Sequence, residues 1–177
     1  MTTVAETARL RLRRVEPGDT DAMFEVYGDA DAMRWVGDGR VLTPEECRQW
    51  VEVTRRNYET RGYGMFAVVE RTSDRVVGFA GLVHPGGHPT PELKYALRRD
   101  AWGRGYATEA ARALLRVAVG LGIREIVATV APGNAASMAV LLKVGMTTGG
   151  LRVDDDGRYT QVFVWRSLAR SAPPTTG

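Results

Sequence analysis

Apolar and polar residues alternate near the start of the chain, where Leu10 and Leu12 are separated by arginines. A period of two residues is typical of a strand that has one buried face and one solvated face. We therefore predict a first strand here. Its solvated face would carry Arg9, Arg11 and Arg13.

Helical spacing and capping residues follow this strand. They predict a helix after Pro17-Gly18-Asp19, a short helical or irregular piece over 30–36, and helices over 43–61, 106–121 and 134–144. The third of these has the clearest start, because Thr43 is a capping residue, Pro44 takes the first helical position and Glu46 lies three residues after the cap. Gly145 is expected to end the last helix as a left-handed cap.

Further apolar runs rich in β-formers predict strands over 65–70, 75–82, 92–97, 125–130, 146–151 and 161–167. The short polar segment 71–74 joins the first two of these runs as a hairpin. No repeat or linker interrupts the series. We therefore predict one α/β domain (α+β type) over 1–170, with a central mixed, mostly antiparallel twisted sheet flanked by helices, and a flexible tail over 171–177.

Composition narrows the class of protein. The chain has 177 residues, 44% of them hydrophobic and 25% charged, which is ordinary for a globular domain. Its apolar stretches fall far short of the roughly 20 residues that a membrane helix needs. Glu6 and nearby arginines occupy the place of a signal peptide's apolar core, and the lone Cys47 has no partner for a disulfide or a zinc site. These features predict a cytoplasmic protein without a membrane segment or a metal.

The basic residues are unusual, because only Lys94 and Lys143 among the 24 are lysines and the other 22 are arginines. Arginine suits phosphate and nucleic acid, so one interpretation is a nucleic-acid binder. The other is a compositional bias of the whole genome. Acidic residues are interleaved with the arginines and the net charge is only +3. We therefore expect no nucleic-acid partner.

A glycine-rich loop carries the strongest chemical signal. The segment Trp102-Gly103-Arg104-Gly105-Tyr106-Ala107-Thr108 follows a predicted strand and opens a predicted helix. Glycines allow backbone N–H groups to approach a ligand, and a helix N-terminus favours phosphate. Arg104 and Thr108 could add a charged contact and a hydroxyl contact. A turn without a ligand is the alternative, and neither the dinucleotide fingerprint nor the P-loop fits this spacing.

This loop resembles the acetyl-CoA motif of the GCN5-related N-acetyltransferase (GNAT) superfamily, in the form found in the RimJ/RimL branch. The first motif position departs from the general family, which has Gln or Arg where this chain has Trp102. A second motif, Asn134-Ala135-Ala136-Ser137 followed by Leu141-Leu142-Lys143-Val144-Gly145-Met146, is similar to that branch in the same order. Met146 replaces the usual Phe. The resemblance covers about residues 8 to 170.

The resemblance implies how acetyl-CoA would bind. The strand before the loop would separate from its neighbour and bind the pantetheine arm through Ala96, Leu97 and Arg98. The amide of Leu97 would be the oxyanion donor. Asn134 would contact the CoA arm, with a role as a helix cap alone as the alternative. The pyrophosphate would be held by the loop residues Gly103, Arg104, Gly105, Tyr106, Ala107 and Thr108.

The resemblance also implies candidate catalytic residues for direct transfer to an amine. In many members a Tyr at the position of Leu141 acts as the general acid. This chain would use Ser137 as the general acid instead, and the alternative is that Ser137 only completes the helix cap. Glu92 would be the general base or else a solvated carboxylate at the strand end. His84 has a suitable pKa range but lies in a Pro/Gly loop. Asp154-Asp155-Asp156 would form a turn or attract a cationic amine.

The expected function is therefore acetyl-CoA-dependent N-acetylation of a primary amine, either a protein N-terminus or a small molecule. A CoA-binding module that has lost turnover is the alternative, because the usual Tyr is missing. Relatives are often dimers, so a homodimer is a possible assembly. The acceptor cannot be read from these motifs.

Overall fold

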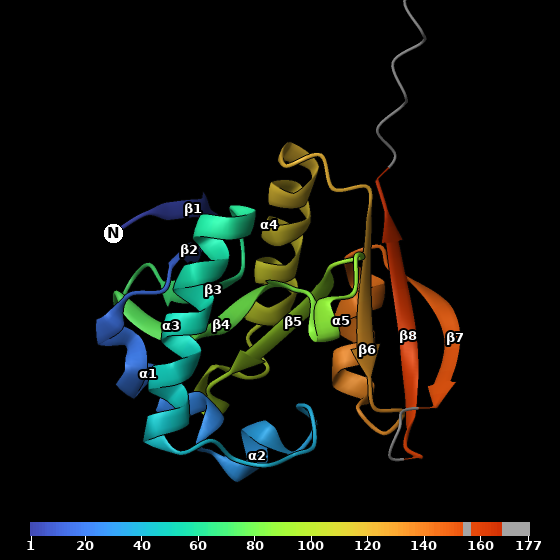
Figure 1. Ribbon diagram of the computed structural model, residues 1–177, viewed down its shortest axis with the longest axis horizontal. Coiled ribbons are helices and arrows are strands. Elements are labelled where there is room, and N and C mark those ends of the chain that lie inside the picture. The colour runs from blue at the N-terminus through green and yellow to red at the C-terminus, as the bar shows by residue number, and fades with distance from the viewer. Residues whose placement is uncertain (154–156, 168–177) are drawn as a thin grey trace, which may run out of the picture.

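The computed structural model describes residues 1–153 and 157–167. Within these ranges eight strands form one mixed sheet in the order β1-β2-β3-β4-β5-β6-β8-β7 (Figure 1). All neighbouring strands are antiparallel except β5 and β6. The strands are β1 (Thr3–Glu6), β2 (Leu10–Arg14), β3 (Met65–Glu70), β4 (Arg75–Val83), β5 (Glu92–Leu97), β6 (Glu125–Val130), β7 (Thr147–Val153) and β8 (Tyr159–Arg166).

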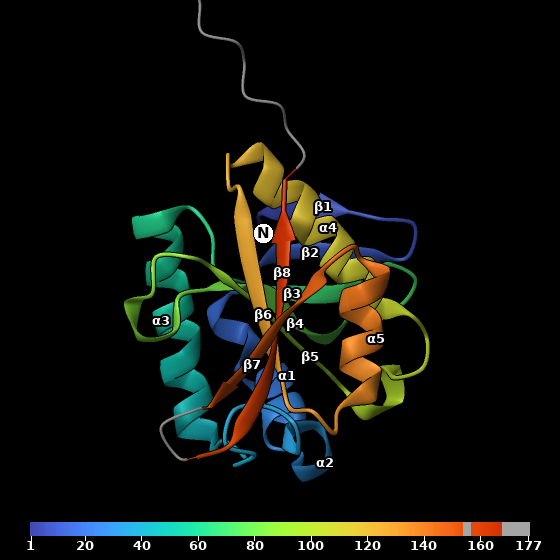
Figure 2. The same ribbon diagram turned by 90° about the vertical axis from the view of Figure 1, so that its right-hand side faces the viewer.

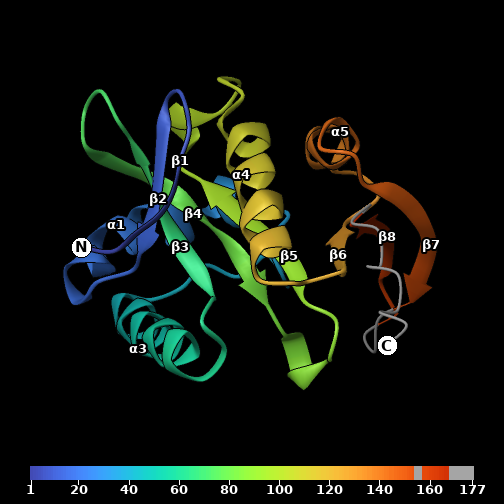
Figure 3. The same ribbon diagram turned by 90° about the horizontal axis from the view of Figure 1, so that it is seen from above.

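Helices cover both faces of this sheet. The α-helices are α1 (Thr20–Tyr27), α2 (Ala30–Met33), α3 (Pro44–Arg61), α4 (Tyr106–Gly120) and α5 (Ala135–Lys143). Seen from above, α3 lies on one side of the sheet and α4 on the other, with α5 on the side of α4 (Figure 3). Two apolar cores result, one between the sheet and α4 and one between the sheet, α1 and α3.

The predicted single α/β domain with a mixed, mostly antiparallel sheet is confirmed. Local signals set most element ends: Thr43 accepts a hydrogen bond from the Glu46 amide at the start of α3, and Gly145 follows α5 with a left-handed φ of 89°. The edge strand β1 was not predicted, and β7 extends two residues past the predicted strand. The predicted tail over 171–177 lies outside the described residues. No helix among the described residues is long and apolar enough to cross a membrane.

The prediction that one face of the first strand is solvated is wrong for Arg13, which is only 7% exposed. Its guanidinium pairs with Asp19 through two hydrogen bonds of 2.7 Å. The hydrogen bond to Asp19 raises the pKa of Arg13. The strand is covered on both sides, because α4 packs on the leucine face and α1 and α3 pack on the face of Arg13. A bidentate carboxylate partner makes burial of the arginine tolerable.

The feature that positions the functional site is the separation of β5 from β6. The two parallel strands pair only at Glu92 and Val127, where the Val127 amide donates to the Pro91 carbonyl at 3.0 Å. Beyond this point they diverge toward the lower edge of the sheet (Figure 1), and α3 and α5 lie on opposite sides of the opening (Figure 2). The sheet therefore contains a V-shaped gap that begins at Glu92.

Candidate active site

A cleft of about 1850 Å³ occupies this V and continues to both faces of the sheet. On one face it is lined by residues of α2, α3 and the segment after β4. On the other it is lined by the glycine loop, the start of α4 and the inner face of α5. The cleft therefore runs through the sheet, so that two molecules entering from opposite faces can meet beside β5.

The backbone of β5 offers hydrogen-bonding groups to the cleft. The Arg98 amide donates to the Val77 carbonyl at 2.9 Å, so Arg98 bonds the neighbouring strand β4. Because backbone groups alternate along an antiparallel strand, Ala96 also faces β4, whereas Tyr95 and Leu97 direct theirs to the open side. The geometry thus suits the predicted role of the Leu97 amide. It does not bring the Arg98 amide into the cleft, and the Arg98 side chain pairs with Glu25 and Asp100.

The glycine loop lies at the end of β5. Gly103 and Gly105 have φ values of 69° and 78°, a left-handed conformation that favours glycine, and Gly105 is the N-cap of α4. Gly103, Gly105, Tyr106, Ala107 and Thr108 all line the cleft. The amides of this helix start are therefore placed to bind an anion such as pyrophosphate.

Trp102, the residue that departs from the general motif, joins this loop to the strand. Its indole Nε1 donates to the Leu97 carbonyl at 2.8 Å. The bond occupies the carbonyl of Leu97 and leaves its amide directed to the open side of the strand. Trp102 thus fixes the distance between the anion-binding loop and the candidate oxyanion donor.

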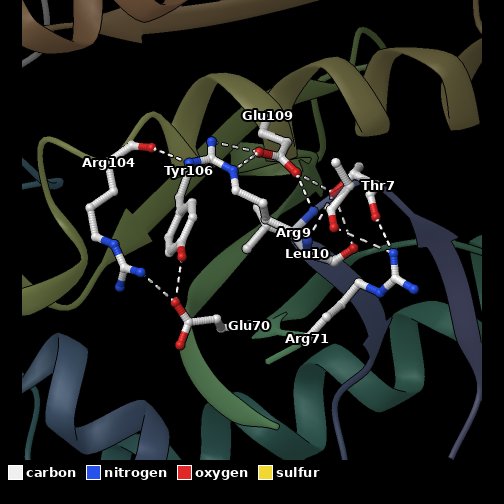
Figure 4. Close-up of polar contacts among 9 residues, drawn as sticks. Thr7, Arg9, Leu10, Glu70, Arg71, Arg104, Tyr106 and Glu109 are labelled. Atoms are coloured by element: carbon white, nitrogen blue, oxygen red, sulfur yellow. Dashed lines mark hydrogen bonds and ion pairs between the residues drawn. The ribbon is translucent and has the colours of Figure 1, made fainter. Parts of the chain in front are cut away.

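The structure does not bring the Arg104 guanidinium into the cleft, contrary to the prediction of a charged phosphate contact. Arg104 pairs with Glu70 at 2.7 Å and stacks on the Tyr106 ring (Figure 4). Hydrogen bonds from the Tyr106 hydroxyl and from Ser73, together with the charge of Arg104, lower the pKa of Glu70 to about 2. The side chain of Arg104 therefore anchors the loop to β3 from outside.

A second anchor holds the loop from the first hairpin. Arg9 donates to the Arg104 carbonyl at 2.8 Å and pairs with Glu109 of α4 at 2.7 Å, and Thr7 also donates to Glu109 (Figure 4). Although partial burial alone would raise the pKa of Glu109, the hydrogen bonds from Thr7 and Arg9 lower it. Arg9 is thus a structural partner of the loop and not merely part of a solvated face.

Three polar side chains meet where β5 and β6 begin to separate. The buried Glu92 is only 5% exposed, so the alternative of a solvated strand-end carboxylate is wrong. Lys94 Nζ lies 2.6 Å from Glu92 Oε1 and 3.2 Å from Thr129 Oγ1, and the Thr129 hydroxyl donates to Glu92. Lys94 and Thr129 line the cleft in front of Glu92. The carboxylate therefore lies behind an ammonium and a hydroxyl that face the cleft, and it is bonded to both.

Two hydroxyl groups meet on the other face of β5. Tyr95 Oη lies 2.6 Å from Ser137 Oγ, and burial raises the pKa of Tyr95. Asn134 caps α5 by accepting from the Ser137 amide at 3.1 Å, so the Ser137 hydroxyl takes no part in the cap. Leu141 is buried where many relatives would have a tyrosine. Tyr95 thus supplies a phenol to the same region from a different element.

His84, the remaining candidate for the general base, has both ring nitrogens in hydrogen bonds. His84 lines the cleft, its Nδ1 lies 2.7 Å from the His88 carbonyl and its Nε2 lies 2.8 Å from the Tyr63 hydroxyl. Nδ1 must carry the proton to donate to a carbonyl, so Nε2 accepts from Tyr63 and has no lone pair left for a substrate proton. The segment Asp154-Asp155-Asp156 lies outside the described residues.

Sequence reasoning missed Lys94, Tyr95 and the role of Trp102. A signal for the first two was present, because a strand places consecutive side chains on opposite faces. Lys94 shares the face of Glu92, whereas Tyr95 points to the face of α4 and α5. The strand pattern could not show their partners. Thr129, the partner of Lys94, lies 35 residues further along the chain, and Ser137, the partner of Tyr95, lies 42 residues further.

The architecture and the anion-binding loop match a known family. The model of the acetyltransferase (GNAT) domain matches residues 9–147, which include both sequence motifs and the strands that form the V. This chain belongs to the GNAT family. It is an N-acetyltransferase of that family, and several of its relatives carry that name.

Individual relatives agree with this GNAT assignment. The N-acetyltransferase YnaD of Bacillus subtilis is 29% identical over 145 residues, covering 81% of this chain and 82% of YnaD. A GNAT-family acetyltransferase structure from Bacillus anthracis has a TM-score of 0.77 and 26% identity, covering 91% of this chain and 96% of that one. RimL, a ribosomal L7/L12 alpha-N-protein acetyltransferase solved with coenzyme A, also has a TM-score of 0.77, at 18% identity over 93% of this chain and 97% of RimL. At that identity RimL shows the shared fold.

Proposed function

We propose that this GNAT enzyme transfers the acetyl group of acetyl-CoA directly to a primary amine. The observation that carries the proposal is the V between β5 and β6. It leaves the Leu97 amide on an open strand edge, next to a loop whose amides can bind pyrophosphate. This combination suits a long thioester with an anionic end. The loop amides can bind the anionic end, while the Leu97 amide donates to the thioester carbonyl.

The reaction divides between the two faces of β5. The amine nitrogen attacks the thioester carbonyl carbon, a C–N bond forms and the developing oxyanion is stabilised by the Leu97 N–H. The C–S bond then breaks, and its electron pair leaves with sulfur. Glu92 on the α3 side takes the proton of the acceptor ammonium before the attack, and the attacking nitrogen loses its second proton to water. The sulfur receives a proton from the Ser137 hydroxyl on the α5 side, and that hydroxyl is reprotonated from solvent.

The pairing of Ser137 with Tyr95 supports turnover rather than a CoA-binding module without activity. The argument for such a module was the leucine in place of the usual tyrosine. Here Tyr95 lies 2.6 Å from Ser137, and its raised pKa keeps its proton through neutral pH. A proton donor is therefore present although Leu141 cannot serve as one.

Two classes of acceptor fit the proposed reaction. The RimJ/RimL form of the loop, with Trp102 at its first position, favours a protein N-terminal amine. The residues that line the α3 side match no acceptor motif, so a small-molecule amine is the second class. Both react by the same chemistry and both require a neutral amine.

Release of CoA thiol tests the proposed function. The purified protein is incubated with acetyl-CoA and a panel of N-terminal peptides and small primary amines, and free thiol is followed with a chromogenic disulfide. We expect thiol release that depends on an acceptor, together with an acetylated product detected by mass. Binding of CoA without thiol release for any acceptor would favour the inactive module.

A further inference from the structure

The lining of the cleft has a strong excess of positive charge. Cationic side chains outnumber carboxylates eight to two among the described residues that form it. Both carboxylates already have partners, since Asp31 pairs with Arg99 at 2.6 Å and Glu46 pairs with Arg40 at 2.8 Å. Such a lining attracts anionic groups and repels a cationic acceptor.

The phosphates of CoA do not account for all of this charge. Arg34 ends α2, Arg61 ends α3 and Lys94 lies on the face of β5 that is turned toward α3. These three belong to the side from which the acceptor enters, opposite the glycine loop. The acceptor itself therefore encounters positive charge on its way to the reacting carbon.

Lys94 is the cation closest to the proposed base. An ammonium has three N–H donors. Glu92 and Thr129 take two of them, and the third has no partner among the described residues. The side chain of Lys94 is 39% exposed, whereas that of Glu92 is 7% exposed. The group that faces an incoming acceptor is thus an ammonium with a donor to spare.

We propose that Lys94 recognises an anionic oxygen on the acceptor, so that the preferred substrates are primary amines that also carry a carboxylate or a phosphate. This inference rests on the proposed function and narrows its acceptor class. It is opposite to the attraction of a cationic amine by Asp154-Asp155-Asp156 that the sequence suggested.

The same contact couples recognition to catalysis. Without a ligand the Lys94 ammonium occupies Glu92 Oε1, so a substrate ammonium must compete with it for the carboxylate. An acidic group on the acceptor gives Lys94 a new partner. Glu92 can then accept the proton of the acceptor nitrogen, which frees the nitrogen lone pair for attack. Amines without an acidic group leave the ion pair closed and react slowly.

Matched acceptor pairs test the proposal. Thiol release is measured with phenylalanine against phenethylamine and with O-phosphoethanolamine against ethanolamine, and spermidine serves as the cationic acceptor. Because hydrogen bonds to charged groups are worth roughly one to two powers of ten in affinity, we expect the acid-bearing member to have a kcat/KM roughly 10- to 100-fold higher. The two pairs distinguish carboxylate from phosphate recognition.

Variants assign the preference to Lys94. In Lys94→Met the ratio within each pair should fall close to one, mainly through a higher KM for the acid-bearing acceptor, and Lys94→Arg should restore most of it. Arg116→Met removes an exposed charge from α4, away from the cleft, and should keep the wild-type ratio. Melting temperatures check that each variant is folded.

The possible failures are distinguishable. Thiol release with equal rates within both pairs, or fastest with spermidine, would overturn the acidic-acceptor proposal and leave the acetyltransferase function standing. A preference that survives in Lys94→Met would also overturn it. Absence of thiol release with every acceptor would overturn the proposed function and this inference with it.

Discussion

The two faces of β5 carry different kinds of polar groups. On the side of α3, Glu92 is held by the charged Lys94 and by Thr129. On the side of α4 and α5, two neutral hydroxyls, those of Tyr95 and Ser137, bond to each other. The strand alternation therefore separates an ionic group suited to take a proton from a neutral group suited to give one.

In the proposed reaction, this difference allows one strand to serve two substrates. A thioester placed along the open edge of β5 has its carbonyl at the strand, its sulfur toward α5 and the acceptor toward α3. Charges on the acceptor side can change the protonation of an amine. Neutral donors on the other side can protonate sulfur without repelling the phosphates of CoA. Substitutions on the α3 face should thus change kcat or the KM for the acceptor, whereas substitutions on the α5 face should change kcat alone.

Removing the carboxylate should give the largest effect. Glu92→Gln keeps the shape of the side chain but cannot take a proton, so we expect kcat to fall roughly 10³-fold, within the range for general bases. The KM for an acid-bearing acceptor should stay the same or fall, because Lys94 loses its competing partner. Steady-state kinetics with saturating acetyl-CoA measure both constants.

Glu125→Gln is a matched control for this change, since Glu125 pairs with Arg166 on the outer part of the sheet. It should keep wild-type kcat. If Glu92→Gln lowers the melting temperature but leaves kcat within about threefold of wild type, an effect far below that of a general base, then the carboxylate is only a structural partner of Lys94.

Removing the serine hydroxyl should give a smaller loss. Ser137→Ala leaves the Asn134 cap intact, because that cap uses the Ser137 amide. We expect kcat to fall about 10²-fold, near the lower end of the range for general acids, since a thiolate is a good leaving group. The KM for the acceptor should be unchanged, and circular dichroism should match wild type.

Thr60→Ala removes an exposed hydroxyl that donates only to backbone carbonyls of α3 among the described residues, and it should have no effect on the rate. An unchanged kcat in Ser137→Ala would exclude the serine as the acid. A raised KM for the acceptor would mean that Ser137 contacts the acceptor and not the sulfur of the thioester.

Much of the fold could be predicted because its signals are local. The cap at Thr43, the glycine after α5 and the period of the apolar residues each depend on residues within one or two turns of chain. The prediction that Arg13 is solvated was wrong for the opposite reason. Its exposure depends on α1 and α3 covering that face and on Asp19 turning back toward it, which alternation along one strand does not contain.

The candidate site likewise has features set by local sequence and features set by contacts between distant segments. The glycine loop was predicted because its glycines and the helix start are contiguous, whereas the direction of Arg104 depends on Glu70, in a different strand. Lys94 and Tyr95 were visible as consecutive strand residues on opposite faces. Their roles depend on their partners Thr129 and Ser137, which come close to them only in the folded protein.

The smallest effect is expected for Tyr95, which we propose acts through Ser137 as a positioning residue. Tyr95→Phe removes one hydrogen bond, so kcat should fall up to about tenfold. Burial raises the pKa of Tyr95 above its usual value of about 10, so its proton is retained at neutral and mildly alkaline pH and lost only above that range. The contribution of the phenol should therefore be constant from pH 6 to 9 and disappear at higher pH. A kcat profile should show wild type above Tyr95→Phe from pH 6 to 9 and converging toward it only where the phenol loses its proton, above about pH 10, with the variant flat in that region. Equal kcat of wild type and Tyr95→Phe from pH 6 to 9 would mean that the phenol only packs against α5 and does not orient the serine.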